Sequence, residues 1–73
     1  MNDKEIQLLN NLAKKIKFRR MELNLSQETL AYKCGLDRTY ISLVERSKRN
    51  PSYLTLFKIS EGLNIDIKNL IGE

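Results

Sequence analysis

The side chains of this chain that could do chemistry are mainly hydrogen-bond donors, and many of them lie between residues 33 and 50. Residues 33 to 49 contain five Lys or Arg residues against two Asp or Glu residues, and the net charge of the whole chain is +4. Guanidinium and ammonium groups bind phosphate oxygens, and a guanidinium can donate two hydrogen bonds to one planar acceptor edge. Such a local positive surface favours a polyanionic partner, most commonly a nucleic acid. Charge alone fits equally well with a solvated surface that only keeps the protein soluble.

Other kinds of chemistry lack the residues that they need. The chain has no histidine and a single cysteine, Cys34, so it has no ligand set for a zinc finger or a catalytic zinc ion. It also has no Gly-rich phosphate loop and no base to activate Cys34, so we do not expect an enzyme. We therefore expect no metal, no cofactor and no small-molecule ligand. No apolar run is long enough for a membrane span or a signal peptide, which predicts a soluble cytoplasmic protein without a membrane partner.

Five helices within one domain of residues 1–73 account for the hydrophobic pattern, and no segment alternates with the two-residue period of a strand. Apolar residues recur at helical spacing in the first of these helices. They are Ile6, Leu9, Ala13, Ile16 and Leu23. This helix is predicted to end at Asn24, because asparagine tolerates the left-handed conformation of many helix ends.

Polar residues suited to capping mark the starts of the later helices. They are Ser26, Asp37, Ser52 and Asp66. The helix that follows Ser26 is predicted to end near Cys34, because Gly35 breaks it. A polar loop at residues 47–51 separates the third helix from the fourth. The fourth helix is expected to supply apolar surface from Leu54, Phe57, Ile59 and Leu63.

Residues 27–46 hold small, apolar and glycine residues at the positions that two helices need when they cross steeply through a tight turn. The pattern consists of Leu30, Ala31, Cys34, Gly35, Leu36, Ile41 and Val44. Ala31 lets the two helices approach closely, and Gly35 can adopt a positive φ in the turn at little cost. The pattern predicts a helix-turn-helix over about residues 27–46, with an ordinary helical hairpin as the alternative.

The chain resembles the phage-repressor (Cro/Xre) class of helix-turn-helix proteins over about residues 12–71. Within that match, the stretches Gly35-Leu36-Asp37-Arg38-Thr39-Tyr40-Ile41-Ser42, Val44-Glu45-Arg46 and Arg49-Asn50-Pro51-Ser52 are similar to the controller proteins of bacterial restriction-modification systems. The resemblance implies an all-α, compact five-helix bundle of the lambda-repressor-like DNA-binding type. It also implies a regulator that activates and represses its own promoter and that of the endonuclease. Leu43 and Ser47 depart from the common pattern, in which a small residue and a glycine are frequent.

The third predicted helix would enter the major groove of DNA with its N-terminal part. Arg38 can donate two hydrogen bonds to guanine O6 and N7, and Thr39 can bond a base or a phosphate and touch a thymine methyl group. The alternative for Arg38 is a solvated side chain beside Asp37. Ser42 shares this exposed face. Leu43 either touches a thymine methyl group or belongs to the edge of the core.

Residues on either side of that helix are expected to extend the DNA contact. They are Gln27, Lys33, Arg46, Lys48, Arg49 and Asn50. Gln27 begins the second helix, where its amide and free backbone N–H groups can meet a phosphate, or where it is only a helix-start residue. Arg49 can reach a base edge from the loop. Tyr40 either gives its hydroxyl to a phosphate, as the resemblance implies, or packs its ring against the first helix.

Glu45 lies at the end of the helix that would approach DNA, so it must be paired and turned away from the phosphates. The resemblance implies an ion pair between Glu45 and Arg20 of the first helix, beneath the DNA surface. Such a pair positions its helices, and removal of one member leaves a partly buried charge.

One recognition helix reads only a few base pairs, so two copies of the chain are expected to bind a pseudo-palindromic site. We expect part of residues 52–71 to form the dimer interface, because the C-terminal segment has more apolar residues than a monomer can hide. The candidates are Leu63, Ile65, Ile67, Leu70 and Ile71. Alternatively, these residues only close the core. RNA polymerase is a further expected partner, and the competing functions are a repressor unconnected with restriction and an antitoxin-like DNA-binding protein.

Overall fold

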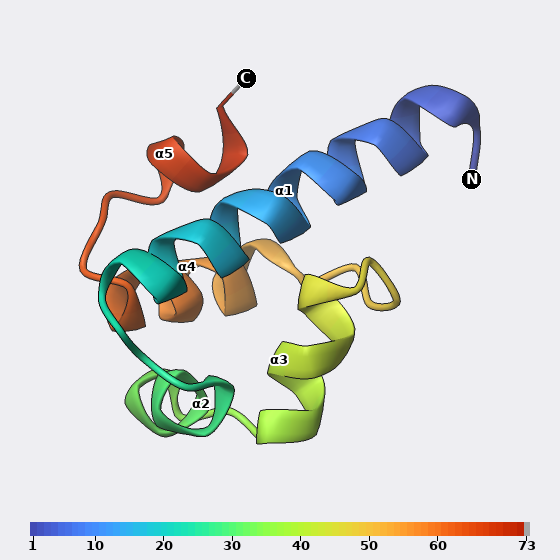
Figure 1. Cartoon of the computed structure of the whole chain (residues 1–73). Helices are drawn as coiled ribbons and strands as arrows, with labels where there is room; N and C mark the ends of the chain where they lie inside the picture. The colour runs from blue at the N-terminus through green and yellow to red at the C-terminus, as the bar shows by residue number, and fades with distance from the viewer. Residues whose placement is uncertain (73) are drawn as a thin grey trace.

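The computed structural model describes residues 1–72 and folds them into five α-helices, with no strand among them. The helices are α1 (Asp3–Glu22), α2 (Gln27–Cys34), α3 (Arg38–Glu45), α4 (Tyr53–Gly62) and α5 (Lys68–Ile71). In Figure 1, the long helix α1 crosses the molecule, with α2 and α3 below it and α5 above it. The predicted all-α fold of five helices is confirmed. Within residues 1–72, no helix combines the length and the hydrophobicity that crossing a membrane requires.

Polar side chains begin the four longer helices. Asn2 and Glu5 form a reciprocal capping box at the start of α1, in which each side chain accepts a backbone N–H of the other at 2.9 Å. The predicted caps at Ser26, Asp37 and Ser52 are confirmed: they accept the backbone N–H groups of Thr29, Thr39 and Thr55 at 3.0, 2.9 and 3.1 Å. Each cap satisfies a donor that the first helical turn would otherwise leave unpaired.

The same backbone motif ends these four helices. A left-handed residue follows each of them, namely Asn24, Gly35, Ser47 and Asn64, with φ between 55° and 69°. The next residue then donates its N–H to a carbonyl five residues earlier, as Leu36 does to Ala31 at 2.8 Å. The helix ends predicted at Asn24 and Gly35 follow from this motif. The left-handed φ at Ser47 also gives a physical reason why glycine suits that position.

The core lies where α1 covers the other helices. Among residues 1–72, the buried hydrophobic residues that form it are Leu9, Ala13, Ile16, Leu30, Ala31, Cys34, Ile41, Val44, Leu56, Ile59, Leu63 and Leu70. The prediction for α1 is confirmed at Leu9, Ala13 and Ile16, but it is wrong at Ile6, which is 43% exposed. Ile6 lies in the first turns of α1, which extend past the other helices (Figure 1).

The apolar surface expected from α4 is only partly buried. Ile59 is buried as expected, but Leu54 and Phe57 are 65% and 46% exposed, and Leu56 is buried in their place. Apolar residues form two stripes on this helix, because residues two apart differ by about 200° around the axis. The stripe that contains Leu56 and Ile59 faces α2, and the stripe that contains Leu54 and Phe57 faces solvent.

The expected dimer interface is wrong at Leu63 and Leu70. These side chains are 0% and 1% exposed within the single chain, so they have no surface to offer a second copy. Ile65 and Ile67 are half-buried and pack against the same core. Ile71 alone of the five remains largely exposed, at 49%. Closing the core of the monomer is therefore the main role of this segment.

Arg19 ties α1 to the C-terminal end of α4. Its guanidinium donates from Nε to the carbonyl of Leu63 at 3.0 Å and from Nη2 to the carbonyl of Asn64 at 3.3 Å. A cation at this place also complements the negative end of the helix dipole. Periodicity alone assigns Arg19 to the polar face of α1 and does not indicate this contact.

The closest approach of α2 and α4 depends on Gly62. A Cβ atom at this position would lie 2.4 Å from Cys34 Sγ and 3.3 Å from Leu30 Cδ1. Cys34 is a free, buried cysteine, and burial raises the pKa of its thiol to about 11, so the group stays protonated and unreactive at neutral pH. The thiol therefore acts as a small apolar group that packs against a glycine.

We expect Gly62→Ala to lower the free energy of unfolding by about 1–3 kcal/mol, because the new methyl group overpacks the contact with Cys34. Urea denaturation measures this loss. Glu61→Ala, at the exposed neighbouring position, serves as the control and should stay within about 0.5 kcal/mol of the parent. A Gly62→Ala protein as stable as the parent would show that α2 and α4 do not approach this closely.

Candidate nucleic-acid interface

The turn between α2 and α3 sets the angle at which α3 leaves the core. Gly35 has φ 69°, and Leu36 donates to the carbonyl of Ala31, so the chain turns from α2 into α3 within three residues. Ala31 is 2% exposed, which leaves no room for a larger side chain between the two helices. The sequence pattern placed these residues correctly, and they hold the start of α3 at the surface.

The two sides of α3 have opposite characters. Ile41 and Val44 are both 0% exposed and anchor one side in the core. Each residue advances the helix by about 100°, so the opposite side consists of Thr39, Ser42, Leu43 and Arg46. Thr39 and Arg46 are exposed, and Ser42 and Leu43 are half-buried. The exposed side of α3 thus carries hydroxyl groups and a cation next to one apolar side chain.

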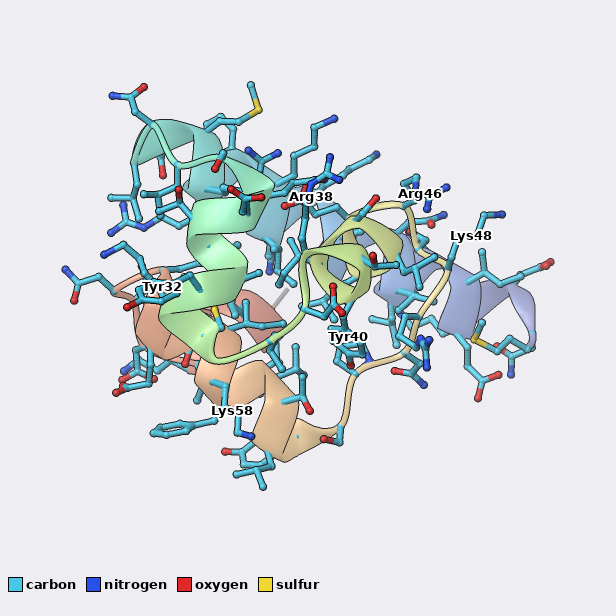
Figure 2. All side chains as sticks on the ribbon, turned by 90° about the horizontal axis from the view of Figure 1, so that it is seen from below. Tyr32, Arg38, Tyr40, Arg46, Lys48 and Lys58 are labelled. Atoms are coloured by element: carbon cyan, nitrogen blue, oxygen red, sulfur yellow. The ribbon has the colours of Figure 1, made fainter. Side chains whose placement is uncertain are left out.

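Arg38 and Tyr40 lie on opposite flanks of this exposed side. Figure 2, which shows α2 and α3 from below, places Arg38 and Arg46 on one side of α3 and Tyr40 on the other. Arg38 is exposed at the first position of the helix, directly after the cap residue Asp37. Because the carboxylate of Asp37 accepts the N–H of Thr39, it is engaged with the backbone at the helix start.

An ion pair between α1 and α3 lies beneath the exposed side of α3. Arg20 donates from Nε to Glu45 Oε2 at 2.7 Å and from Nη2 to Glu45 Oε1 at 3.0 Å. The side chains of Arg20 and Glu45 are only 13% and 2% exposed. The hydrogen bond to Glu45 raises the pKa of the Arg20 guanidinium, against the opposing effect of burial. The expected pair is therefore present, and it keeps the Glu45 carboxylate away from solvent.

Two further groups complete this ion pair. Arg20 Nη1 donates to the carbonyl of Leu25 at 2.8 Å, and the side-chain amide of Gln27 donates to Glu45 Oε1 at 3.1 Å. The pair therefore joins α1, the start of α2 and the end of α3. The link between Gln27 and Glu45 could not be predicted from local sequence, because only the folded chain brings residues 18 positions apart together.

The position of Gln27 limits how it could meet DNA. One N–H of its amide is engaged by Glu45, and its amide oxygen, like a phosphate oxygen, is an acceptor. Only the second amide N–H and the backbone N–H groups at the start of α2 remain as donors. Gln27 is thus both a helix-start residue and a part of the network around Glu45.

The loop after α3 adds three exposed polar residues, Lys48, Arg49 and Asn50. Arg46 stays near α3, where its Nε approaches the carbonyl of Ser42 at 3.4 Å. Asn50 borders a hollow between α1 and α5. Lys48 lies beyond Arg46 at the same edge of the molecule (Figure 2). The loop therefore continues the positive surface of α3.

Tyr40 combines two environments. Its ring is half-buried and packs against the hydrophobic core, whose residues come from several helices. The guanidinium of Arg49 lies over the same ring, 5.5 Å from its centroid, within the range of a cation–π contact. This contact could not be predicted from the sequence, because it depends on the conformation of the loop after α3.

Lys33 does not join the other expected contact residues. It lines a hollow at the C-terminal ends of α1, α2 and α4, together with Leu23, Leu25, Glu61, Gly62 and Asn64. Lys33 is the penultimate residue of α2 and lies far along that helix from Gln27. The contact expected between Lys33 and DNA stays a prediction.

Comparison with known proteins gives one family. The helix-turn-helix family model (HTH_3) matches residues 16–70. Over all 73 residues, the chain is 44% identical to the control protein C.MunI of Mycoplasma sp, and the match covers 95% of that protein. Among solved structures, the chain is similar to the restriction-modification controller protein C.AhdI from Aeromonas hydrophila, with 39% identity, a TM-score of 0.83, and 85% and 94% of the two chains covered.

A second similar structure includes DNA. It is the C.Esp1396I controller protein, described as a tetramer in complex with its natural 35-base-pair operator. The identity is 40%, the TM-score is 0.79, and the match covers 88% of this chain and 95% of the other.

Proposed function

Since the chain belongs to the helix-turn-helix family, and is a DNA-binding transcription regulator of the restriction-modification controller type, we propose that it binds a pseudo-palindromic operator as a homodimer. One observation carries this proposal. The side of α3 opposite the buried Ile41 and Val44 presents donors and one apolar group, while the acidic Glu45 is enclosed by Arg20. This arrangement suits the floor of a major groove and removes the charge that phosphates would repel.

Base contacts come from the first turn of α3. Arg38 is exposed and free to donate two parallel hydrogen bonds to guanine O6 and N7. Thr39 follows it with a hydroxyl and a methyl group. Ser42 and Leu43 lie farther along the same exposed side and contact the next bases. The four side chains together cover a half-site of a few base pairs.

Phosphate contacts fix the protein in register without reading the sequence. Arg46, Lys48 and Asn50 serve this role at one end of α3, and Gln27 serves it at the start of α2. The C.Esp1396I controller protein forms a complex with its operator, which supports DNA binding by this chain.

The homodimer has its support in the surface near α5. Ile71 is 49% exposed and borders a largely apolar hollow that also includes Met1 and Leu8 of the α1 end. The C.Esp1396I protein is a tetramer on its operator, so self-association is part of how that relative binds. A homodimer that reads two half-sites on one face of B-DNA needs its two α3 helices about 34 Å apart, one helical turn.

Regulation follows from where the operator lies. A dimer that covers the promoter represses it, and a dimer bound beside RNA polymerase activates it by offering a contact surface. As a controller protein, the chain would act in the bacterial cytoplasm on its own promoter and on that of an endonuclease. Its response would depend on its own concentration through dimerisation and through occupancy of adjacent sites.

Footprinting on the DNA upstream of the protein's own gene tests the proposal. We expect two protected half-sites whose centres lie about one helical turn apart. Sedimentation of the free protein at high micromolar concentration should show a dimer. A monomer at that concentration would contradict the homodimer, and the absence of any protected sequence would contradict operator binding itself.

A further inference from the structure

We propose that Tyr40 is a positioning residue for Arg49, and that its ring holds this loop arginine ready for DNA on the flank of α3 opposite Arg38. The proposal rests on the proposed function, because it concerns the same surface. Tyr40 could act in two ways: its hydroxyl group could contact a phosphate, or its ring could orient Arg49. The structure favours the ring.

The ring of Tyr40 is a fixed platform. It is half-buried and packs against the hydrophobic core, two positions after Arg38 at the start of α3. Arg49 is exposed and comes from the loop that follows α3, yet its guanidinium lies 5.5 Å from the ring centroid. The Tyr40 ring is therefore held by the core, whereas the Arg49 side chain lies at the surface.

The loop is held at both ends, so the position of Arg49 is restricted. At the first end, Ser47 adopts a left-handed φ of 60°, and Lys48 donates its N–H to the carbonyl of Leu43 at 2.8 Å. At the other end, Pro51 is buried and precedes the cap of α4. Only residues 48–50 remain exposed between these anchors, and the middle one lies over Tyr40.

A guanidinium held over a ring keeps its donors available. The attraction is between the positive charge and the π face of the ring, and it needs none of the N–H groups as hydrogen-bond donors to oxygen. Within residues 1–72, Arg49 forms no ion pair with a carboxylate, so these donors are not consumed inside the chain. Stacking also removes rotamer freedom before DNA arrives, which lowers the entropy cost of the contact.

The consequence is a contact surface with an arginine on each flank. Arg38 and Tyr40 differ by about 200° around the axis of α3. Arg38 therefore contacts DNA on one side of α3, and Arg49 contacts DNA on the other side. Held in this way, Arg49 acts as a second arginine with a preset direction, although it belongs to a loop.

The test is a double-mutant cycle on operator affinity. We expect Tyr40→Leu to weaken operator binding by about 5-fold to 30-fold for a dimer with two such contacts, and Tyr40→Phe to stay within about 3-fold of the parent. In an Arg49→Gln background, Tyr40→Leu should cause no further loss. In an Arg46→Gln background, the matched control, Tyr40→Leu should retain its full effect, because Arg46 does not lie over the ring.

A measurement without DNA checks the stacking itself. In the free protein, NMR should show the Arg49 side-chain protons shifted upfield by the ring current of Tyr40, and the shift should persist in Tyr40→Phe and vanish in Tyr40→Leu. Thermal unfolding of each variant identifies a temperature at which all are folded. The absence of this shift in the parent would overturn the proposal.

The affinity results can also overturn the proposal in two ways. Tyr40→Phe could lose as much operator affinity as Tyr40→Leu, which would show that the hydroxyl group causes the effect. Tyr40→Leu could reduce operator affinity by the same factor in the parent and in the Arg49→Gln background, which would show that the ring acts independently of Arg49. Failure of the parent to select an operator would instead contradict the proposed function, while the NMR shift would still decide the stacking.

Discussion

Arg20→Met lowers the free energy of unfolding by about 3–5 kcal/mol, because it leaves the Glu45 carboxylate buried without its partner. The Glu45 side chain is 2% exposed and receives two hydrogen bonds from Arg20, at 2.7 and 3.0 Å. After the substitution, only the amide of Gln27 would still donate to this carboxylate. Urea denaturation followed by circular dichroism measures the loss.

Two further variants decide whether the buried charge is the cause. The double substitution Arg20→Met with Glu45→Met should recover most of the loss, since it removes both charges. Lys17→Met, at an exposed position of the same helix, should change stability by no more than about 0.5 kcal/mol. A decrease in the free energy of unfolding of less than about 1 kcal/mol for Arg20→Met would show that the ion pair is too solvated to hold α3 in place.

Arg38→Ala weakens binding to the operator by about 1–3 kcal/mol per half-site and changes binding to random DNA little. Arg38 is exposed at the first position of α3, where we propose that it contacts a base. Binding to random DNA depends instead on contacts with phosphates. Titration of the purified dimer against operator DNA and random DNA of the same length measures both affinities.

Lys48→Ala is the matched control, because Lys48 is an exposed cation of the loop that is expected to meet a phosphate. It should weaken binding to both DNAs alike and reduce the slope of log affinity against log salt by about one. Equal losses on both DNAs for Arg38→Ala would instead identify Arg38 as a phosphate contact.

Local chemistry made much of the fold predictable. Caps at Ser26, Asp37 and Ser52, and the break at Gly35, depend on a few neighbouring residues, so the sequence indicates them directly. The helix-turn-helix followed from the same kind of evidence, because its small and apolar residues lie within twenty positions of one another. The side of α3 that faces solvent is the complement of its buried side, and it too could be predicted.

The errors came from choices that depend on distant parts of the chain. α4 has two apolar stripes. Packing against α2 buries the stripe that contains Leu56 and leaves Leu54 and Phe57 exposed to solvent. The C-terminal segment looked too apolar for a monomer, yet Leu63 and Leu70 fit wholly inside it. Lys33 shares a positive stretch of sequence with the residues of α3, but it lines a hollow together with Glu61 and Gly62 of α4.

The amino-acid sequence by itself determined where the helices begin and end, which side of α3 carries donors, and the kind of partner that those donors suit, because these properties arise from neighbouring residues and helical period. Tertiary structure alone decided how the donors are supported. Gln27 joins Arg20 at Glu45, and Arg49 lies over Tyr40, only after loops and helix crossings bring separate segments within contact distance. Side-chain contacts act over a few ångströms, and spacing along the chain does not reveal which residues will meet at that range.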